Sequence, residues 1–499
     1  MKRQILMVHA LTEWYDINKP SERFINLNLG FLRIATICDK KNIGYSILDF
    51  NNGNIDYNDL IDLQNMENPA LIIISVDIKS IRSALRITDL VKKQNKKVKV
   101  MWCSIGISFH VPIVAIQKEK ALDIDKVDYI FYDNEIVLNE FFDQFFSNQP
   151  ISSDGIGFKK NGKKVFNPYS NNKTYIRENY NAINIEDYIW RWGHEIVAPP
   201  YQKRQRILPI VTGVGCAYSC TFCINSNKCW KKLFRIKPKK MLLSQMRELI
   251  EKYDPDIIYF EDDNSFIQKD RIEAALNLVI KYDKKWVGQG RGEYFREDYL
   301  NDDFFKKYFK DRCLWFGIGF ETFSDDLRNK LNKNATTVQL ERAAQLCDKY
   351  DIPFNPALIY GTVEETVDEF KSDLLKLVEF HKKYPKTTFS FQLWRPYPGT
   401  KEFFKVQEKS FIKNYPEKIE DWINYEIDYK THGWLSPRFK RLILFARFFS
   451  WRFFTYDSFG KYWYERIVFK KLVNDFKNEK LFFFKIYRLI HNVLRRISK

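Results

Sequence analysis

The sequence lacks any long apolar run, although 45% of its 499 residues are hydrophobic. No stretch approaches the roughly 20 apolar residues that a transmembrane helix needs, so we expect no membrane span. Polar residues also interrupt the apolar run behind the basic start Met1–Lys2–Arg3 before it reaches signal-peptide length. We therefore predict a cytoplasmic protein with large cores, divided into more than one domain because the chain is long for a single one.

Cysteine is scarce, and the arrangement of the eight cysteines excludes two common uses. A zinc ribbon would show two separated Cys-x-x-Cys pairs, and an extracellular disulfide framework would show evenly spread cysteines in a short chain. Neither pattern is present. Four cysteines fall in predicted buried strands and helices, where we expect small hydrophobic residues: Cys38, Cys103, Cys313 and Cys347.

Three other cysteines form the most specific pattern in the chain. Cys216, Cys220 and Cys223 follow the spacing Cys-x-x-x-Cys-x-x-Cys in the segment 213–223. Three thiolates on one short loop can bind three irons of a [4Fe–4S] cluster, which needs four ligands to be closed. The fourth iron would then stay open to a substrate. Cys229 supports an alternative, because as a fourth ligand it would leave a closed electron-transfer or structural centre.

This segment resembles the cluster loop of the radical S-adenosylmethionine (SAM) enzymes. The resemblance implies that SAM binds the open iron, and that one electron from the cluster cleaves it to methionine and a 5'-deoxyadenosyl radical. An electron donor such as flavodoxin or ferredoxin would supply that electron. Phe222 matches the family position whose ring lies beside the adenine. Gly213 and Gly215 would let the backbone pass close to the cluster without a Cβ clash.

Strands and helices alternate after the cysteine loop, which predicts a (βα)6 partial barrel with its site at the carboxyl ends of the strands. Helices such as Pro238 to Tyr253 and Val338 to Tyr350 separate the strands. The six expected strands are Leu208 to Thr212, Asp256 to Phe260, Trp286 to Gly290, Leu314 to Phe320, Phe354 to Tyr360, and Thr388 to Trp394.

Polar residues follow three of these strands, and the resemblance assigns them to SAM. Residues after the second strand would bind the ammonium group, and a carboxylate beside a cationic amine is electrostatically sensible. The residue after the third strand resembles the contact to the SAM carboxylate, and the fourth strand ends in candidates for ribose or amino-acid contacts. Any one of these polar residues, taken by itself, could equally be a solvated residue at a strand end or the cap of a helix. The six candidates are Glu261, Asp262, Asp263, Arg291, Glu321 and Thr322.

Two turns extend the resemblance over most of the stretch from Leu208 to Thr400. Residues 359–366 look like the family's Gly-x-Pro-Gly-Glu-Thr turn, with Val363–Glu364 in place of Pro-Gly, and Thr366 would cap the next helix. Residues 395–400 match the Pro-x-Pro-Gly-Thr turn after the sixth strand.

The N-terminal region alternates β-rich and helical runs, as a parallel α/β layer does. Its expected strands are Ile5 to His9, Tyr45 to Asp49, Ala70 to Val76, Val98 to Cys103 and Tyr129 to Tyr132. The Leu29–Gly30 pair, and the acidic Asp49 at the end of the next strand, resemble the Rossmann-like cobalamin-binding domain that precedes many radical SAM barrels. The segment 128–135 stands where that family has its Gly-Glu-Gly-Glu turn, but it contains no glycine.

Other departures leave cobalamin binding open. The paired glycines after the fourth strand are here Ser104–Ile105–Gly106, and the Asp-x-His-x-x-Gly signature of a cobalt-ligating histidine is absent. Glycine would let the backbone approach the corrin, so its loss counts against binding. His9 and His110 lie near the expected cofactor edge, where we favour ordinary hydrogen-bonded histidines. The cofactor-facing loops would be Ser75 to Lys79 and Ser104 to Ser108.

We therefore predict four regions: a Rossmann-like domain over 1–150, a linker over 151–206, the barrel over 207–405 and a basic, aromatic helical region over 406–499. After Thr431 the chain has 16 lysines and arginines against 4 aspartates and glutamates, a net +12 of the total +18. A basic, apolar helix over 482–497 could contact an anionic membrane, although docking on the barrel is favoured. The aromatic cluster from Phe445 to Phe454 could admit an apolar or lipid-like substrate.

Taken alone, the sequence predicts a radical SAM enzyme that methylates an unactivated carbon if cobalamin is bound. Without cobalamin, the same barrel could perform a cyclisation or rearrangement. A closed four-cysteine cluster would instead give a non-enzymatic iron–sulfur or RNA-binding protein. The basic charge fits nucleic acid, but a helical tail argues against the RNA-modifying relatives, which carry a β-rich C-terminal domain. The sequence assigns neither a catalytic residue nor a substrate.

Overall fold

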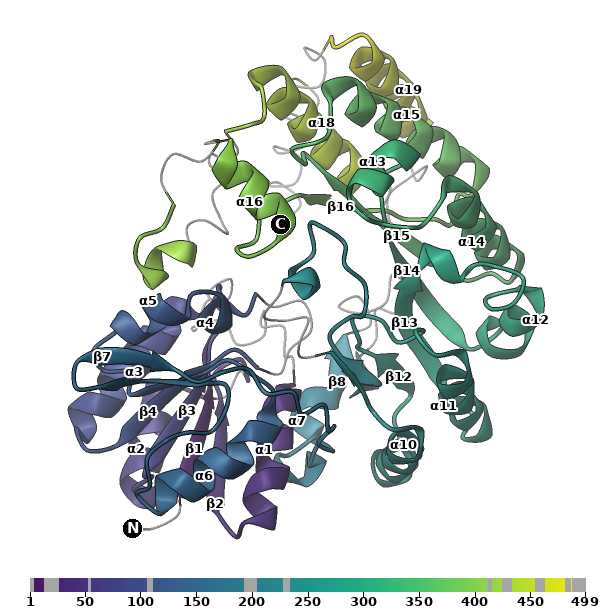
Figure 1. Cartoon of the computed structure of the whole chain (residues 1–499). Helices are drawn as coiled ribbons and strands as arrows, with labels where there is room; N and C mark the ends of the chain where they lie inside the picture. The colour runs from purple at the N-terminus through teal and green to yellow at the C-terminus, as the bar shows by residue number, and fades with distance from the viewer. Residues whose placement is uncertain are drawn as a thin grey trace.

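The computed structural model describes residues 4–12, 27–52, 55–105, 111–192, 204–227, 234–409, 411, 415–423, 433–453, 463–480 and 486. Two seven-stranded sheets carry most of these residues, and β10 and β11 form a separate two-stranded pair. Figure 1 shows the N-terminal sheet in purple and blue beside the second sheet, which curls in teal and green. Within the described ranges, no helix is both long and apolar enough to cross a bilayer.

The first sheet has the strand order β2-β1-β3-β4-β5-β6-β7. Its first five strands pair in parallel and confirm the five strands expected in this region, while β6 and β7 add an antiparallel hairpin. The bounds are β1 (Gln4–His9), β2 (Gly44–Asp49), β3 (Leu71–Ser75), β4 (Lys99–Cys103), β5 (Tyr129–Phe131), β6 (Ile156–Lys160) and β7 (Lys163–Phe166).

Helices cover both faces of the first sheet, which explains why its parallel strands are apolar throughout. Ile5 and Met7 of β1 face the core shared with α1 and α6, and Leu6 and Val8 face the core shared with α2 to α5. The bounds are α1 (Leu29–Lys40), α2 (Tyr57–Glu67), α3 (Ile81–Gln94), α4 (Ile113–Ile116), α5 (Lys118–Asp123), η2 (Glu135–Val137) and α6 (Leu138–Phe146).

The second sheet has the order β16-β15-β14-β13-β12-β9-β8, and six of its strands run in parallel. These six confirm the partial barrel predicted from the sequence. The bounds are β8 (Trp190–Trp192), β9 (Arg204–Ile210), β12 (Ile257–Phe260), β13 (Lys285–Arg291), β14 (Cys313–Glu321), β15 (Phe354–Tyr360) and β16 (Ser390–Leu393). The two short strands beside them are β10 (Gly213–Val214) and β11 (Arg235–Ile236).

Helices pack on the outside of the barrel around the largest hydrophobic core of the chain. The two helices predicted by range are present as α10 and α14. The bounds are η4 (Ile224–Ser226), α10 (Lys239–Tyr253), α11 (Lys269–Lys281), η5 (Gly292–Tyr294), α12 (Asp302–Phe304), η6 (Phe305–Phe309), α13 (Asp325–Lys330), α14 (Thr337–Lys349), α15 (Val367–Lys383), α16 (Lys401–Glu408) and η7 (Ile419–Asp421).

The segment interpreted as a linker has more regular structure than its irregular pattern indicates. It supplies β6 and β7 to the first sheet and β8 to the second, with η3 (Tyr180–Ala182) and α7 (Glu186–Ile189) between them. Asn161 and Gly162 connect the hairpin at φ values of 51° and 75°, the left-handed conformation that tight hairpin turns require. The hairpin lies at a sheet edge, where lysines remain solvated, so its strands show no strong apolar period.

Most of the described residues of the basic C-terminal region are helical. Helices α18 (Pro437–Phe453) and α19 (Trp463–Lys477) pack on α15. Phe439 lies 5.2 Å from Phe370 of α15, and Phe445 stacks on Phe476 at 4.9 Å between ring centroids. Phe445 therefore joins the barrel core. Apart from Ile486, the expected basic helix over 482–497 lies outside the described residues, as do Phe454, Cys229 and His110.

Candidate cluster and SAM site

The cysteine loop begins where β9 leaves the barrel. Gly215 has a φ of 71°, which glycine adopts without strain, and a Cβ on Gly213 would lie only 3.0 Å from the carbonyl oxygen of Arg235. The backbone N–H of Cys223 donates to the Cys220 carbonyl at 3.1 Å and closes the turn. Both glycines therefore allow the loop to fold tightly against β11.

The three thiols of this loop are free, and those of Cys216 and Cys220 are buried. Among the described residues, no three His, Cys, Asp or Glu side chains are grouped to hold a single metal ion. A [4Fe–4S] cluster imposes no such convergence, because each cysteine binds a different iron. Burial raises the pKa of the Cys223 thiol to about 12 and also raises that of Cys216, so binding iron would have to displace their protons.

Two buried side chains direct nitrogen atoms at the thiols. Nη1 of Arg291 lies 3.5 Å from Sγ of Cys220, and Nδ2 of Asn264 lies 4.0 Å from Sγ of Cys216. N–H groups directed at sulfur stabilise thiolates and are one of the factors that tune iron–sulfur clusters. The donor set of three thiols, two of them with N–H partners, therefore fits a three-cysteine cluster.

Arg291 is held in one orientation by two neighbours. Its guanidinium lies 3.7 Å from the centre of the Tyr218 ring, and its Nε and Nη2 both contact Oε1 of Glu293. Burial would lower the pKa of Arg291, but Glu293 and Cys220 raise it above its usual value. A charged, planar guanidinium therefore faces the cysteine loop. Glu293 uses its Nε–Nη2 edge, so a bound carboxylate would have to approach the edge formed by Nη1 and Nη2.

The three acidic candidates after β12 lie in different surroundings. The buried Asp262 carboxylate accepts from Thr212, from its N–H at 2.6 Å and from its hydroxyl, and so holds the start of the cysteine loop. Burial raises the pKa of Asp263 to about 6, while hydrogen bonds from Asn225 and Gly215 oppose this rise. Glu261 is buried at the same strand end.

The two candidates after β14 are also unlike each other. Glu321 has a φ of 79° and pairs through Oε1 with Nζ of the buried Lys333 at 2.8 Å. The hydroxyl of Thr322 donates to Asp373 and accepts from the N–H of Ser324, so it is occupied within the fold. Whether any of the six candidates contacts SAM stays a prediction.

Three residues at the site escaped sequence reasoning. Lys333 lies on the loop after α13, which also contacts the cysteine loop through Leu331 and Thr221 at 2.9 Å. Tyr294 exchanges hydrogen bonds of 2.8 and 2.9 Å with Asn264, and Tyr218 stacks on Arg291. Tyr218 lies inside the cysteine motif, so its position was a usable signal. The sequence around Lys333 contains no signal that could have indicated its place at the site.

The turn after β16 reaches the far end of the cysteine loop. The amide of Asn227 donates to the Pro398 carbonyl at 3.2 Å, and the N–H of Glu402 donates to the Thr221 carbonyl at 3.3 Å. The part-buried Phe222 packs against a core to which both β1 of the first sheet and the segment after β16, with Trp394 and Phe403, contribute.

The polar residues at the carboxyl edge of the first sheet are engaged with one another. Nδ1 of His9 lies 3.0 Å from Oδ1 of Asp49, and the Tyr188 hydroxyl donates to the same carboxylate at 3.1 Å. Burial would lower the pKa of His9, but Asp49 raises it above its usual value. The hydroxyls of Ser75 and Ser104 donate to backbone carbonyls. His9 is therefore hydrogen-bonded, as expected from the sequence, and its exclusion as a cobalt ligand stays a prediction.

Comparison with known proteins agrees with this geometry. Residues 210–376 match the model of the Radical SAM superfamily. Bacteriochlorophyllide d C-12(1)-methyltransferase of Chlorobaculum tepidum is 21% identical over 232 residues, covering 46% of this chain and 47% of that protein. The C-8(2)-methyltransferase of the same organism is 26% identical over 234 residues, covering 44% and 47%. The chain thus matches about half the length of these curated relatives.

Two solved structures share the fold over most of the chain. The cobalamin-dependent SAM radical enzyme OxsB, with aqua-cobalamin and SAM bound, covers 99% of this chain and 81% of its own, with a TM-score of 0.67 and 14% identity. The radical SAM methyltransferase TsrM from Kitasatospora setae, with cobalamin and a [4Fe–4S] cluster bound, covers 87% and 83%, with a TM-score of 0.63 and 13% identity. The chain therefore contains a radical SAM domain, joined to an N-terminal Rossmann-like sheet in the fold of the cobalamin-dependent radical SAM proteins.

Proposed function

We propose that this protein is a radical SAM methyltransferase that acts on an unactivated carbon with the help of cobalamin. The observation that carries the proposal is the cysteine loop, whose thiols face Arg291 and Asn264 at the carboxyl ends of the barrel strands. The names of the two methyltransferase relatives and of the cobalamin-binding structures support the choice of reaction.

In this proposal the chain's own residues hold the cofactors in place. Cys216, Cys220 and Cys223 would ligate the cluster, and Arg291 would hold the SAM carboxylate because its fork is preset by Glu293 and Tyr218. Asp263 would receive the ammonium group. When bound, the cluster and SAM supply reductive cleavage to a deoxyadenosyl radical, and cobalamin supplies the methyl group.

The remaining predicted SAM residues divide by the contacts they already make. We assign Glu261 to the ammonium group with Asp263, Phe222 to the adenine, and Glu321 to the ribose. Asp262 already uses both carboxylate oxygens and Thr322 its one hydroxyl within the fold, so we assign them to holding the loop and the strand end, whereas Glu321 pairs with Lys333 through Oε1. Cobalamin would lie at the carboxyl edge of the first sheet, where the order β2-β1-β3 creates a topological switch point.

Anaerobic reconstitution tests the proposal. Reduced protein should bind about four iron atoms per chain, the content of one [4Fe–4S] cluster. It should also cleave SAM to 5'-deoxyadenosine. Cys216→Ala should abolish both iron binding and cleavage. Absorbance of bound cobalamin would support methylation, whereas SAM cleavage by protein that binds no cobalamin would favour cyclisation or rearrangement. Loss of cleavage in Cys229→Ala would instead revive the closed four-cysteine cluster.

We further propose an acidic electron donor of the flavodoxin or ferredoxin type, an apolar substrate, and peripheral contact of the basic C-terminal segment with an anionic membrane. A radical SAM enzyme needs a reductant, and the net charge of +18 would attract an acidic one. A rate of cleavage that falls steeply with added salt when flavodoxin, but not dithionite, is the reductant would support the electrostatic contact.

A further inference from the structure

A buried group of charged side chains joins the first sheet to the barrel, and we call it the interface charge cluster. Each member is at most 5% exposed, although lysine, arginine and glutamate are almost never fully buried unless they are paired. The members come from α1, η2, the segment before η3, and the neighbourhood of β11: Arg33, Glu135, Glu178, Arg235 and Lys237.

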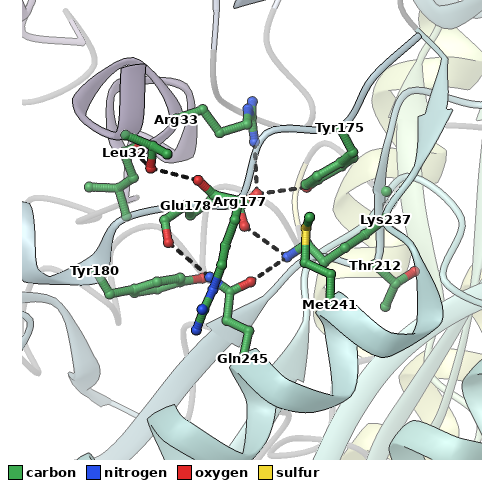
Figure 2. Close-up of polar contacts among 12 residues, drawn as sticks. Leu32, Arg33, Tyr175, Arg177, Glu178, Tyr180, Thr212, Lys237, Met241 and Gln245 are labelled. Atoms are coloured by element: carbon green, nitrogen blue, oxygen red, sulfur yellow. Dashed lines mark hydrogen bonds and ion pairs between the residues drawn. The ribbon is translucent and has the colours of Figure 1, made fainter. Parts of the chain in front are cut away.

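Glu178 connects three parts of the molecule. Its Oε1 lies 3.1 Å from Nη1 of Arg33 and accepts from the Tyr175 hydroxyl at 2.6 Å, and its Oε2 lies 2.8 Å from Nζ of Lys237. Figure 2 shows these side chains converging on Glu178, with Gln245 of α10 contacting both Lys237 and the Glu178 backbone. The segment between the two sheets is thus tied to both.

Glu135 of η2, the short helix that follows β5 of the first sheet, makes the direct link to β11. Its Oε1 lies 2.7 Å from Nη2 of Arg33, and its Oε2 pairs with Nη2 of Arg235. Burial would raise the pKa of Glu135, but the two arginines hold it below its usual value, so the carboxylate stays charged. Glu135 lies in the segment 128–135, where the cobalamin-binding relatives would have a glycine-rich turn.

The strand that receives this link is the support of the cysteine loop. Arg235 pairs in register with Val214, two residues before Cys216, and the N–H of Lys237 donates to the Thr212 carbonyl at 3.0 Å. The backbone of Phe234 also packs on Gly215. A Cβ atom placed on Gly215 would lie 3.6 Å from the Cα atom of Phe234. A displacement of β11 would therefore displace the start of the cysteine loop.

We propose that Glu135 and Arg235 are positioning residues through which the first sheet holds the cysteine loop and sets the reduction potential of its cluster. The inference rests on the proposed function only in requiring a cluster on this loop. The potential of an iron–sulfur cluster depends on the charge and hydrogen bonds around it. Within the interface charge cluster, three cations against two carboxylates give an excess of one positive charge, which would favour the more negative, reduced iron–sulfur cluster.

Two substitutions in the full-length, reconstituted protein should shift the potential in opposite directions. Arg235→Met removes a cation and the link to β11, while Glu135 keeps its partner Arg33, so the midpoint potential should fall. Glu135→Gln removes a carboxylate and leaves both arginines charged, so the potential should rise. A redox titration followed by electron paramagnetic resonance measures both, and iron content should equal that of the unsubstituted protein.

The control is Arg177→Gln. This substitution breaks the exposed ion pair between Arg177 and Glu248 of α10, which lies next to the interface charge cluster. It should leave the potential unchanged. Shifts of the same sign in both test variants, or lower melting temperatures with unmoved potentials, would overturn the proposal in favour of a purely structural role. If Glu135→Gln does not fold, an unchanged or raised midpoint potential in Arg235→Met would by itself overturn the proposal. Unsubstituted protein without iron would count against the proposed function instead.

Discussion

The side chains around the three cysteines are oriented by other side chains, many of them distant in sequence. Arg291 is fixed by Glu293 and Tyr218, and Glu321 is fixed by Lys333. Such prior orientation lowers the entropy that binding a small charged ligand would cost. Because these side chains are held in fixed positions, we expect that a substitution that keeps the charge but changes the shape weakens SAM binding.

Arg291→Lys tests this at one position. Lysine keeps the charge but can neither offer a planar fork to a carboxylate nor stack on Tyr218 in the same way. We expect the KM for SAM to rise roughly tenfold or more, by loss of part of a charge-assisted contact, with cluster absorbance unchanged. The control is Arg296→Lys in the exposed pair with Asp298. An unchanged KM in Arg291→Lys would remove Arg291 from the SAM site.

The lowered pKa of Glu178 predicts that the free energy of unfolding depends on pH. Burial would raise its pKa from the ordinary 4.5, but Lys237 and Arg33 lower it to about 2. The folded state therefore binds this proton more weakly than the unfolded state, so the stabilisation is complete above pH 4.5 and is lost as the pH falls towards 2. The loss amounts to about 3 kcal/mol at 1.36 kcal/mol per pKa unit.

Urea unfolding of the unsubstituted protein and of Glu178→Gln at pH 5 and pH 3 measures this contribution. The free energy of unfolding should fall more steeply between the two pH values in the unsubstituted protein. Parallel pH profiles would show that Glu178 contributes nothing to the acid sensitivity, whatever the absolute stability of the variant.

At the scale of the element, apolar periodicity carried the prediction of the eleven strands expected in the two sheets, all of which are present. It failed for β6 and β7, whose lysines lie at a solvated edge, for the three-residue strand β8, and for the two-residue strands β10 and β11. The interface charge cluster also lay beyond sequence reasoning, because Arg33 and Glu178 are 145 residues apart. Contacts of that separation depend on the packing of the two sheets and leave no local pattern.

The turn before α15 offers a prediction at this scale. Thr366 caps the helix by accepting from the N–H of Glu369, whose side chain accepts in return from the N–H of Thr366. Thr366→Ala should lower the free energy of unfolding by about 1 kcal/mol. Because the capping hydroxyl is occupied within the helix end, the rate of SAM cleavage should stay the same. A loss of cleavage without a loss of stability would assign Thr366 to the site.

At the scale of the whole molecule, the proposed membrane contact and the packing on the barrel are assigned to different parts of the basic C-terminal region. The face of α18 that carries Phe439, Leu442 and Phe445 is buried against the barrel side of the molecule. Arg438 and Lys371 both pair with Glu479, which follows α19. Truncation after Thr431 would therefore expose core and confuse loss of membrane binding with loss of folding. Truncation after Lys480 would retain both helices.

Removal of residues 481–499 should separate these roles. The segment carries five lysines and arginines and no acidic residue. Each basic residue near an anionic surface contributes about 1 kcal/mol at low salt, a contribution that added salt screens. The full chain should therefore sediment with phosphatidylserine vesicles but not with neutral ones, and the shortened chain should lose at least roughly tenfold of that affinity. Its melting temperature should stay close to that of the full chain, since the contacts of α18 and α19 with α15 are kept. Equal sedimentation of both chains would place any membrane contact elsewhere on the molecule.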